Sequence, residues 1–403
     1  MDMENQQSND LLSELGPNEI ADILDLTIKA DRANKIATLL CMVSAFSEES
    51  QFNISFNAPS SSGKSYIALE IAALFPPESV LKLAYASPTA FFHEQVSFDK
   101  ERNAHVVDLA RRIIVFVDMP HTDLLARLRP LLSHDEREVH AKITDKTKSA
   151  GLRAKTVIIR GFPSVIFCTA GLKTDEQEAT RFLLLSPETS QGKIRDAIKL
   201  GVWRATNPEE FSTWLNAAPR RRLLMRRIEA LRNSNIRWVR IADGRKIEQR
   251  FLETRKTLKP RHARDVRRVI SLVQAFALLN FPHRERDGED ITASANDIDW
   301  AFESWDQLSE AQEYDIAPYL LQLYREVIIA EWRSYGGTRG ITSGEIIKAH
   351  HIVYGRPLPD WQLRQQVLPP LESAGLISLE ADPNDKRRKL VVPLALIGPE
   401  TRP

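Results

Sequence analysis

The residue types best suited to chemistry gather in one short segment, Ala58-Pro59-Ser60-Ser61-Ser62-Gly63-Lys64-Ser65. Small residues let the backbone curl so that its N–H groups face an anion, and a helix that follows adds its positive dipole end. Lys64 can bridge the β- and γ-phosphates of ATP, and the Ser65 hydroxyl can ligate Mg²⁺. The spacing is that of a phosphate-binding loop with Ala58 in place of the first glycine. It predicts a site for ATP and Mg²⁺, and the alternative is a Ser-rich surface turn.

An acidic residue, Asp118, follows a second segment of interest, the apolar run 113–117. A buried strand would carry this carboxylate to the sheet edge beside the loop, where it holds Mg²⁺ through water. The next position, where a second acid would polarise the attacking water, is a methionine. Two registers stay open: Asp118 is the metal-side acid and the base is missing, or Asp118 is the base and Val117 stands in the metal-side position. Loss of a base costs on the order of 10² to 10⁴ in rate. We therefore expect slow hydrolysis, with Asp123 or Asp108 as substitutes, unless Asp118 only ends a strand.

Three further polar residues stand where an ATPase needs them. Thr169 ends the apolar strand predicted at 165–169, so its side chain can orient water near the γ-phosphate as a sensor 1 residue. Arg181 precedes an apolar run and is placed as an arginine finger, which acts on a neighbouring subunit and so requires an oligomer. Arg264, with Arg261 as second choice, opens an apolar helical segment and can reach the γ-phosphate as sensor 2. The alternatives are a polar strand end, a surface arginine and a solvated helix end.

The elements that must position these residues alternate between strand and helix, which predicts an α/β fold with a parallel sheet covered on both faces. Apolar residues at helical spacing predict helix within 20–46. Strands are predicted at 51–57, 80–86, 104–109, 113–117 and 165–169, and helices at 65–74 and 122–132. Residues 190–310 are predicted to be mostly helical.

Two segments combine a predicted structure with positive charge. β-Prone arms flank Ser149-Ala150-Gly151, which predicts a β-hairpin over about 140–161. The C-terminal part is predicted to form helices at 317–334, 343–352 and 360–374 and then two strands, the order of a winged-helix domain. Its wing carries Lys386, Arg387 and Arg388, which can lie along a DNA backbone. Other side chains that could contact DNA lie on the preceding helix: Trp361, Gln362, Arg364 and Gln365. A solvated hairpin and a protein-binding winged helix are the alternatives.

Charge is distributed unevenly, although the net charge of the whole chain is only +1. Residues 219–268 hold 18 Lys/Arg and 5 Asp/Glu, a local charge of +13. Such a concentration attracts polyanions, and with only five acids inside the segment it favours nucleic acid or nucleotide phosphate as partner. The alternative is a solvated helix face with internal ion pairs.

The composition, with 43% hydrophobic and 27% charged residues, is ordinary for a soluble protein of two or three domains. No apolar run is long enough to cross a bilayer, and the polar N-terminus does not resemble a signal peptide. Cys41 and Cys168 lie in apolar stretches without zinc spacing, which favours a reducing compartment. These features predict a cytoplasmic protein without a membrane partner.

The order of the motifs resembles the AAA+ ATPases that carry a pre-sensor-1 β-hairpin, and within them the minichromosome-maintenance (MCM)-like DNA helicases of mobile elements and plasmids. The matching segments are APSSSGKS, IIVFVDMP, LLARLRPLLS, VIFCTA, ATRFLL and RHARDVRRVISLVQAFALL. The resemblance covers about 50–310, plus the winged helix. The sequence departs from the pattern in the first loop glycine and in the acidic pair. From the sequence we expect no N-terminal OB-fold, zinc-bearing DNA-binding region or primase domain.

The resemblance implies roles for particular residues. It implies nucleotide contact by Ser62 to Ser65, metal contact through Asp118, and contact of Lys146, Lys148 and Arg153 on the hairpin with DNA in a central pore. The implied domains are an N-terminal helical segment (1–48), an AAA+ core (49–190), a helical lid (191–312) and a winged helix (313–403). The implied protein is a homo-oligomer, most simply a hexamer, that acts as a helicase on single-stranded or forked DNA. The alternatives are a non-motor AAA+ initiation or transposition factor that assembles on DNA, and a pseudo-ATPase scaffold.

Overall fold

The computed structural model describes residues 13–84, 91, 97–120, 122–145, 153–171, 181–255, 257–383, 385 and 387–395, without the side chains of 122, 143–145, 153 and 154. The chain forms two compact units. The first comprises Met1–Ser55, Gly63–Cys168 and Glu188–Gln307, and the second comprises Phe56–Ser62, Thr169–Pro187 and Leu308–Pro403. This division leaves the predicted domain boundaries untested.

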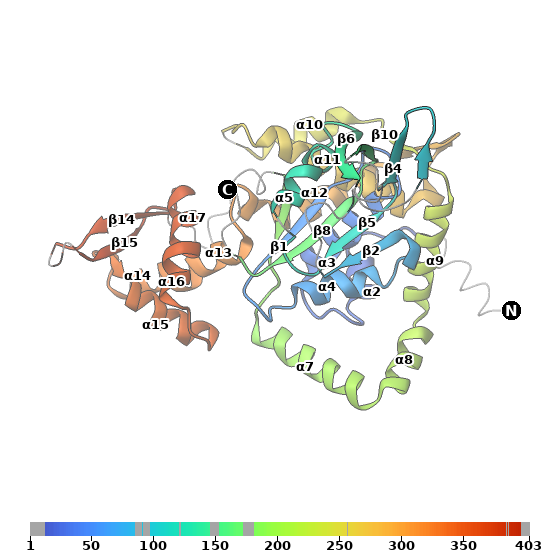
Figure 1. Ribbon diagram of the computed structural model, residues 1–403. Coiled ribbons are helices and arrows are strands. Elements are labelled where there is room, and N and C mark those ends of the chain that lie inside the picture. The colour runs from blue at the N-terminus through green and yellow to red at the C-terminus, as the bar shows by residue number, and fades with distance from the viewer. Residues whose placement is uncertain are drawn as a thin grey trace. The chain divides into compact units, whose positions relative to one another are not determined.

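A five-stranded parallel sheet forms the centre of the fold (Figure 1), with the strand order β2-β5-β8-β1-β9. Its strands are β1 (Asn53–Asn57), β2 (Val80–Leu83), β5 (Ile113–Phe116), β8 (Ser164–Thr169) and β9 (Phe182–Leu185). Four of them were predicted from the sequence. Strands β1, β5 and β9 are buried at every position, as expected for a parallel sheet covered on both faces. The predicted parallel α/β sheet is therefore confirmed.

Helices of the first unit stack in a layer beside this sheet. The N-terminal helices are α2 (Pro17–Leu24) and α3 (Arg32–Ser44), and α4 (Lys64–Ala72) follows β1. Ala30 and Asp31 have φ values of 54° and 53°, so the backbone turns between α2 and α3 and the segment is not one continuous helix. Helix α3 packs against both α4 and α11 (His262–Leu279). The apolar face of α3 thus packs between α4, which follows the loop, and α11, which begins near Arg264.

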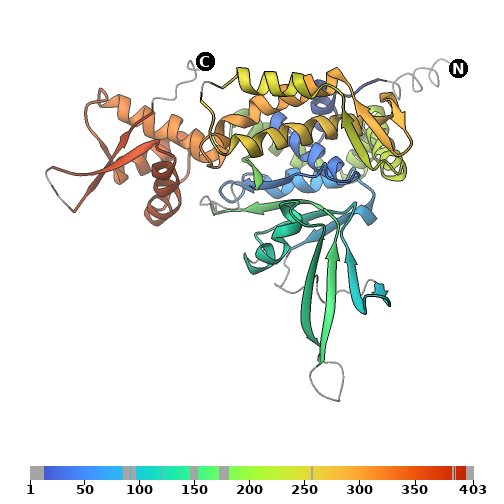
Figure 2. The same cartoon turned by 90° about the horizontal axis from the view of Figure 1, so that it is seen from above.

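A second sheet carries the predicted hairpin, in the order β3-β4-β7-β6. Its strands are β3 (Ser97–Asp99), β4 (Ala104–Asp108), β6 (Glu138–Asp145) and β7 (Arg153–Arg160). Strands β6 and β7 pair antiparallel from Glu138↔Arg160 to Asp145↔Arg153, and Figure 2 shows them projecting from the rest of the first unit. The hairpin prediction is confirmed. Helix α5 (Thr122–Leu132), also predicted, lies before β6.

The expectation that strand 104–109 belongs to the central sheet is wrong. Strand β4 pairs parallel with β7, from Ala104↔Thr156 to Asp108↔Arg160. Only four residues separate β4 from β5, and a crossover between parallel strands of one sheet needs about a dozen. The short connection therefore places the two strands in different sheets.

The remainder of the first unit is mostly helical, as predicted. Its elements include α7 (Gln191–Thr206), α8 (Pro208–Ala217), α9 (Pro219–Asn233), α10 (Gly244–Glu253) and α12 (Ala295–Gln312), the last of which runs into the second unit. A small sheet of β10 (Trp238–Ile241), β12 (Asp290–Ala293) and β11 (Arg286–Asp287) was not predicted. Within the described part of the chain, no helix has both the length and the hydropathy to cross a bilayer.

The second unit ends in a compact helix–strand arrangement. Its elements in chain order are α13 (Pro318–Leu323), the π-helical η4 (Tyr324–Ile329), α14 (Ala330–Ser334), β13 (Ile341–Thr342), α15 (Ser343–Tyr354), α16 (Asp360–Gln362), η5 (Leu363–Val367), α17 (Leu368–Ser373), β14 (Ile377–Ala381) and β15 (Lys389–Pro393). The strands form the sheet β13-β15-β14. The buried Tyr324 hydroxyl lies at hydrogen-bond distance from the carbonyls of Leu376 (2.8 Å) and Ala395 (2.7 Å) and can donate its one proton to either. This contact connects η4 to the ends of β14 and β15. The three predicted helices and two strands are confirmed as elements.

Candidate nucleotide-binding site

The loop after β1 turns sharply before α4 begins. Ser61 has φ 63°, and Gly63 is the N-cap of α4 with φ 93° and ψ 12°. A side chain at Gly63 would meet no atom within 4 Å, so glycine is required by the backbone angle and not by space. The α-helical bond from Ile67 N–H to the Gly63 carbonyl (3.0 Å) opens the helix. The helix begins at Lys64, one residue earlier than predicted, and its positive end faces the loop.

The first unit gathers Lys64, Ser65 and Asp118 around one buried thiol. The Ser65 hydroxyl donates to the Val117 carbonyl at 3.2 Å, so the start of α4 lies against the end of β5. Burial raises the pKa of the Cys168 thiol to about 11; the Ser65 hydroxyl and Lys64 act to lower it, and Asp118 acts to raise it. All three groups are therefore close enough to Cys168 to act on it electrostatically. The predicted phosphate-binding and acidic residues lie at the same carboxyl-terminal edge of the sheet.

Lys64 and Asp118 differ in their exposure to solvent. Lys64 is buried, with only 8% of its surface exposed. Asp118 is exposed, and its Oδ1 accepts the Met119 N–H at 2.8 Å, which fixes one carboxylate oxygen beside the chain. The carboxylate is thus positioned and still open to a ligand from solvent.

One of the two proposed substitutes for a missing base is already engaged. Asp108 accepts the Arg160 Nε–H at 2.9 Å through Oδ2 and the Ala110 N–H at 2.9 Å through Oδ1. These bonds hold its carboxylate in the second sheet, at the end of β4. Asp123 is exposed in the first turn of α5.

The second unit contributes the backbone of 58–62 and the tip of β8. The Ala58 N–H donates to the Thr169 carbonyl at 3.4 Å. The Thr169 Oγ1 accepts the Gly171 N–H at 3.0 Å, so the side chain stands at the strand end where a sensor residue was predicted. The Ser186 hydroxyl donates to the Asn57 carbonyl at 2.6 Å and accepts the Tyr319 N–H at 3.0 Å. This buried hydroxyl connects the end of β1 to the start of α13, within the second unit.

The arginines proposed for the finger and for sensor 2 have different surroundings. Arg181 is half-buried and immediately precedes β9. Arg264 is exposed in the first turn of α11. Arg261, the second choice, donates Nε–H to Asp265 Oδ2 at 2.9 Å and Nη2–H to Oδ1 at 3.2 Å. Because Asp265 is 1% exposed and also pairs with Arg268 at 3.0 Å, Arg261 is bound to the first turn of α11. Arg264 remains the candidate.

The predicted DNA-contacting residues lie partly outside the described residues: Lys146, Lys148 and Lys386 entirely, and Arg153 except for its backbone in β7. Arg387 and Arg388 are described and exposed. With Arg364, Lys389 and the start of α15 they line a cleft of about 570 Å³ in the second unit. Arg364 pairs with Asp360 at 2.8 Å and Arg388 with Asp385 at 3.3 Å. These exposed pairs contribute little free energy and can exchange for phosphate.

The basic segment 219–268 finds more acids than its own sequence holds, so the argument from five internal acids is wrong. Arg232 pairs with Glu78 at 2.6 Å, Arg237 with Glu48 at 2.9 Å, Arg240 with Asp290 at 2.6 Å and Arg250 with Asp299 at 2.8 Å. Every one of these acids lies outside the segment but inside the first unit. Part of the local charge is therefore neutralised by long-range ion pairs.

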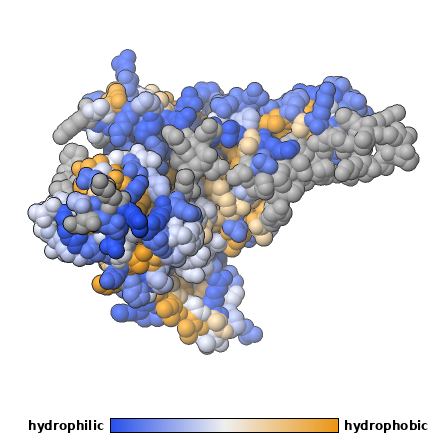
Figure 3. All heavy atoms as spheres, turned by 60° about the vertical axis from the view of Figure 1, so that its left-hand side comes forward, coloured by the Kyte–Doolittle hydropathy of each residue, from blue (hydrophilic) through white to orange (hydrophobic). Residues whose placement is uncertain are grey.

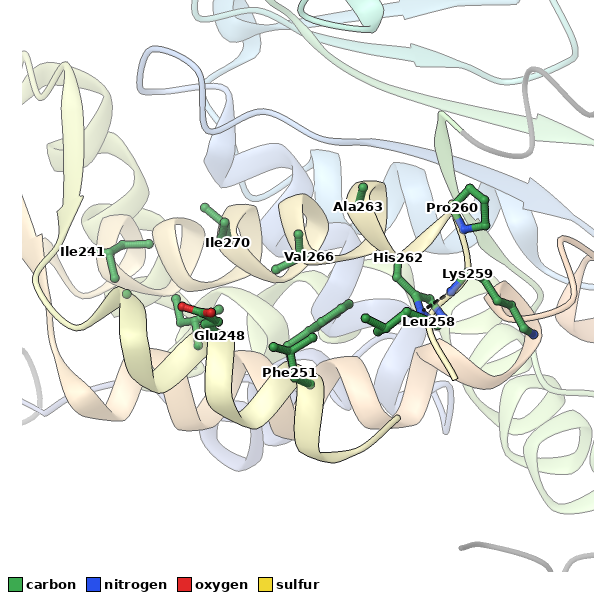
Figure 4. A pocket seen from close by; sticks show the side chains of 13 residues that line it. Ile241, Glu248, Phe251, Leu258, Lys259, Pro260, His262, Ala263, Val266 and Ile270 are labelled. Carbon is green, nitrogen blue, oxygen red and sulfur yellow. Dashed lines mark hydrogen bonds between the residues drawn. The ribbon is translucent and has the colours of Figure 1, made fainter. Parts of the chain in front are cut away.

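An apolar groove of about 590 Å³ lies between α10 and α11, well away in sequence from the loop (Figure 4). Phe251, Leu258 and Val266 point into it in Figure 4, and His262 Nδ1 accepts the Lys259 N–H at 3.1 Å at one end. Its walls are almost entirely apolar. They offer no cluster of donors for a triphosphate, so this groove is not the nucleotide site.

Neither the scan of protein-family models nor the search of curated proteins finds a match for this sequence.

Proposed function

We propose that this protein is a DNA-associated AAA+ ATPase, most simply an oligomeric MCM-like helicase. The observation that carries the proposal is the sharp turn at Gly63 that opens α4, with the Ser65 hydroxyl 3.2 Å from the Val117 carbonyl next to Asp118. A lysine, a hydroxyl, a helix start and a carboxylate meet there. This combination suits a nucleotide triphosphate and its metal ion.

The donor set fits Mg²⁺, which prefers hard oxygen ligands and keeps several waters. Ser65 Oγ and the exposed Asp118 carboxylate would hold it, and it would supply charge neutralisation at the β- and γ-phosphates. The Lys64 ammonium would bind those phosphates. The N–H groups at the start of α4 would donate hydrogen bonds to the remaining phosphate oxygens. The Ser65 hydroxyl contacts the carbonyl of Val117, the residue before Asp118, and this contact is compatible with both registers of the acidic position.

The sheet order supports an ATPase with a sensor strand. Strand β8 lies between β5, which precedes Asp118, and β1, which precedes the loop. A side chain at the tip of β8 is therefore delivered between the metal-side acid and the phosphate loop. Thr169 occupies that tip, and its hydroxyl would orient the attacking water.

A projecting basic hairpin and a basic wing support DNA as the partner. Lys142 and Arg160 are exposed on β6 and β7, and the C-terminal cleft collects four cationic side chains. The order of elements in residues 318–393 is that of a winged helix, a fold that often binds DNA through its third helix and its wing. Positive charge along a strand supplies affinity for phosphates without a sequence preference.

An exposed apolar stripe supports assembly into an oligomer. Ile194, Ile198 and Val202 lie one helical turn apart on α7 and are 43%, 60% and 56% exposed. Helices α7 and α8 form the lowest part of Figure 1, and orange apolar atoms gather at the foot of Figure 3. A monomer gains nothing from such a stripe. We propose that a second copy of the chain covers it in a ring, as a trans-acting Arg181 requires, so Ile198→Asp should yield monomers in size-exclusion chromatography.

The enzymatic test is ATP turnover with and without single-stranded DNA. We expect slow hydrolysis that DNA stimulates, and background rates for Lys64→Ala. Lys199→Ala is the matched control, because Lys199 is a highly exposed lysine on α7, outside the loop. Equal rates for wild type and Lys64→Ala would overturn the enzyme and leave a pseudo-ATPase scaffold.

A forked-duplex assay distinguishes a helicase from a non-motor AAA+ regulator. The missing second acid favours the regulator. Strand separation that needs ATP supports the motor, and binding without separation supports the regulator.

For the hairpin, the double substitution Lys148→Glu with Arg153→Glu should make the plot of log affinity for single-stranded DNA against log salt concentration less steep by about 1.4. An unchanged slope would move the DNA site elsewhere.

Both cysteines are buried and free among the described residues, which supports the proposed reducing, cytoplasmic location.

A further inference from the structure

The opposite edge of the central sheet holds a second cluster of positive charge. A cavity of about 480 Å³ lies where β2 and β5 begin and α9 ends (Figure 1). Its lining is Glu78, Ser79, Ala110, Arg111, Arg112, Arg232, Asn233 and Asn235. Three arginines and one glutamate thus line the cavity, all within the first unit. Strand β5 spans four residues, roughly 13 Å, so this cavity is separate from the phosphate loop at the other end of the strand.

Backbone carbonyls hold the arginines in place. Arg111 donates Nη2–H to the Arg232 carbonyl at 2.8 Å and Nη1–H to the Ile236 carbonyl at 3.5 Å. Arg112 donates Nη1–H to the Glu78 carbonyl. Neutral carbonyls orient the guanidinium groups without cancelling their charge. An arginine fixed in this way loses little further entropy when it binds an anion.

The charges in the cavity are not balanced. Arg232 pairs with Glu78 at 2.6 Å, and no other acid lines the cavity. Burial and the like charge of Arg232 lower the pKa of the half-buried Arg111, and Glu48, which lies outside the lining, acts to raise it. Arg111 also has φ 57°, and Asn235 φ 53°, which is a costly backbone conformation for residues other than glycine. An anion between the guanidinium groups would offset this repulsion.

A buried hydroxyl without a partner provides an independent sign of a ligand. Ser79 is 2% exposed, lines the cavity, and its Oγ makes no hydrogen bond. A buried hydroxyl left unsatisfied costs about 1–3 kcal/mol. The Ser79 Oγ has almost no surface open to the cavity, so a phosphate oxygen would accept its hydrogen bond once the side chain turned toward the arginines.

We propose that this cavity binds a phosphate group, held by Arg112 and Arg232 with Arg111 and the Ser79 hydroxyl behind them. Three arginines and a hydroxyl match the planar, multidentate recognition of phosphate oxygens. The phosphate is that of a small phosphorylated ligand or of a nucleic-acid backbone. The site does not depend on the nucleotide site proposed above.

The test is calorimetric titration of inorganic pyrophosphate into the full-length Lys64→Ala protein at low ionic strength, which disables the phosphate loop. We expect binding that Arg112→Glu weakens about ten- to a hundredfold, since it removes a charge-assisted hydrogen bond. Arg195→Glu on α7 is the control, because the same charge change at an exposed arginine outside the cavity should leave the affinity nearly unchanged. No pyrophosphate binding by Lys64→Ala, or equal weakening by both glutamate variants, would overturn the site.

Ser79→Ala separates ligand binding from a purely structural role. We expect it to weaken pyrophosphate binding several-fold while the free energy of unfolding stays equal or rises, because it removes an unsatisfied hydroxyl. Weaker folding with unchanged pyrophosphate affinity would contradict the proposal. Titration with a single-stranded oligothymidylate identifies the source: parallel weakening by Arg112→Glu indicates a nucleic-acid backbone, and weakening of pyrophosphate alone indicates a small ligand.

Discussion

The two ends of the central strands present positive charge in different ways. At the carboxyl-terminal end, a curled backbone and a helix start surround one lysine, with the Asp118 carboxylate opposite. At the amino-terminal end, backbone carbonyls orient the guanidinium groups of Arg111 and Arg112, and Arg232 pairs with Glu78 of the same cavity. We propose that the first arrangement binds a metal-complexed triphosphate whose charge changes during a reaction. In the second, the Glu78 carboxylate is already paired with Arg232. This arrangement therefore suits binding of an anion without a chemical reaction.

Asp118→Asn should give the largest effect and should separate chemistry from binding at the carboxyl-terminal end. We expect ATP turnover to fall on the order of 10² to 10⁴-fold, while Lys64 and the loop still bind nucleotide. Steady-state phosphate release measures the rate, and a fluorescent nucleotide measures affinity. Turnover close to wild type would assign the essential acid to another residue, with Asp123→Asn as the next variant.

The alkylation rate of Cys168 tests whether the start of α4 packs against β5 and β8. With its pKa raised to about 11, only about one thousandth of the thiol is ionised at pH 8. Alkylation should therefore be about 100-fold slower than for an unperturbed thiol and should accelerate as the pH rises toward 11. Mass spectrometry after iodoacetamide treatment measures it, and rapid labelling of Cys168 at pH 8 would show that the loop does not cover it.

Two glycine substitutions test whether the loop depends on a left-handed backbone. Gly63→Ala should cost about 1–2 kcal/mol of stability, because alanine is strained at φ 93°. Gly201→Ala, in the interior of the exposed α7, meets no neighbour and should stabilise by roughly 0.5–1 kcal/mol. Urea unfolding of both variants gives the comparison. Equal, stabilising changes would mean that the turn at Gly63 is not formed.

The smallest expected effect concerns the independence of the two ends. Because they are separated by the length of β5, the substitutions Lys64→Ala and Arg112→Glu should act additively on stability to within about 0.5 kcal/mol. Arg112→Glu should change the affinity for MgATP less than about twofold. A larger change would show that the two anion sites communicate.

Local features of the sequence predicted the local structure. The loop, its flanking strand and helix, and the two hairpin strands each depend on a few adjacent residues, and these elements were found. The predicted turn at Ser149-Ala150-Gly151 lies outside the described residues. The hydroxyl–carbonyl contact between Ser65 and Val117 could be expected because parallel strands end at one edge.

Features that depend on distant residues were not predictable in this way. The four-residue link between β4 and β5 could have excluded a shared sheet, but β4's partner β7 lies about 50 residues away. The ion pairs of the basic segment recruit acids such as Glu48 and Asp299. The amino-terminal cavity joins the Arg111-Arg112 pair with Arg232, and its only sequence signal was that adjacent pair.

Equilibrium titration with MgATP tests the central claim most directly. Wild type and Lys199→Ala should bind with the same Kd, and Lys64→Ala should bind at least about tenfold more weakly, since a charge-assisted contact to the phosphates is lost. Identical MgATP affinity of Lys64→Ala and wild type would contradict the assignment of the loop as the nucleotide site.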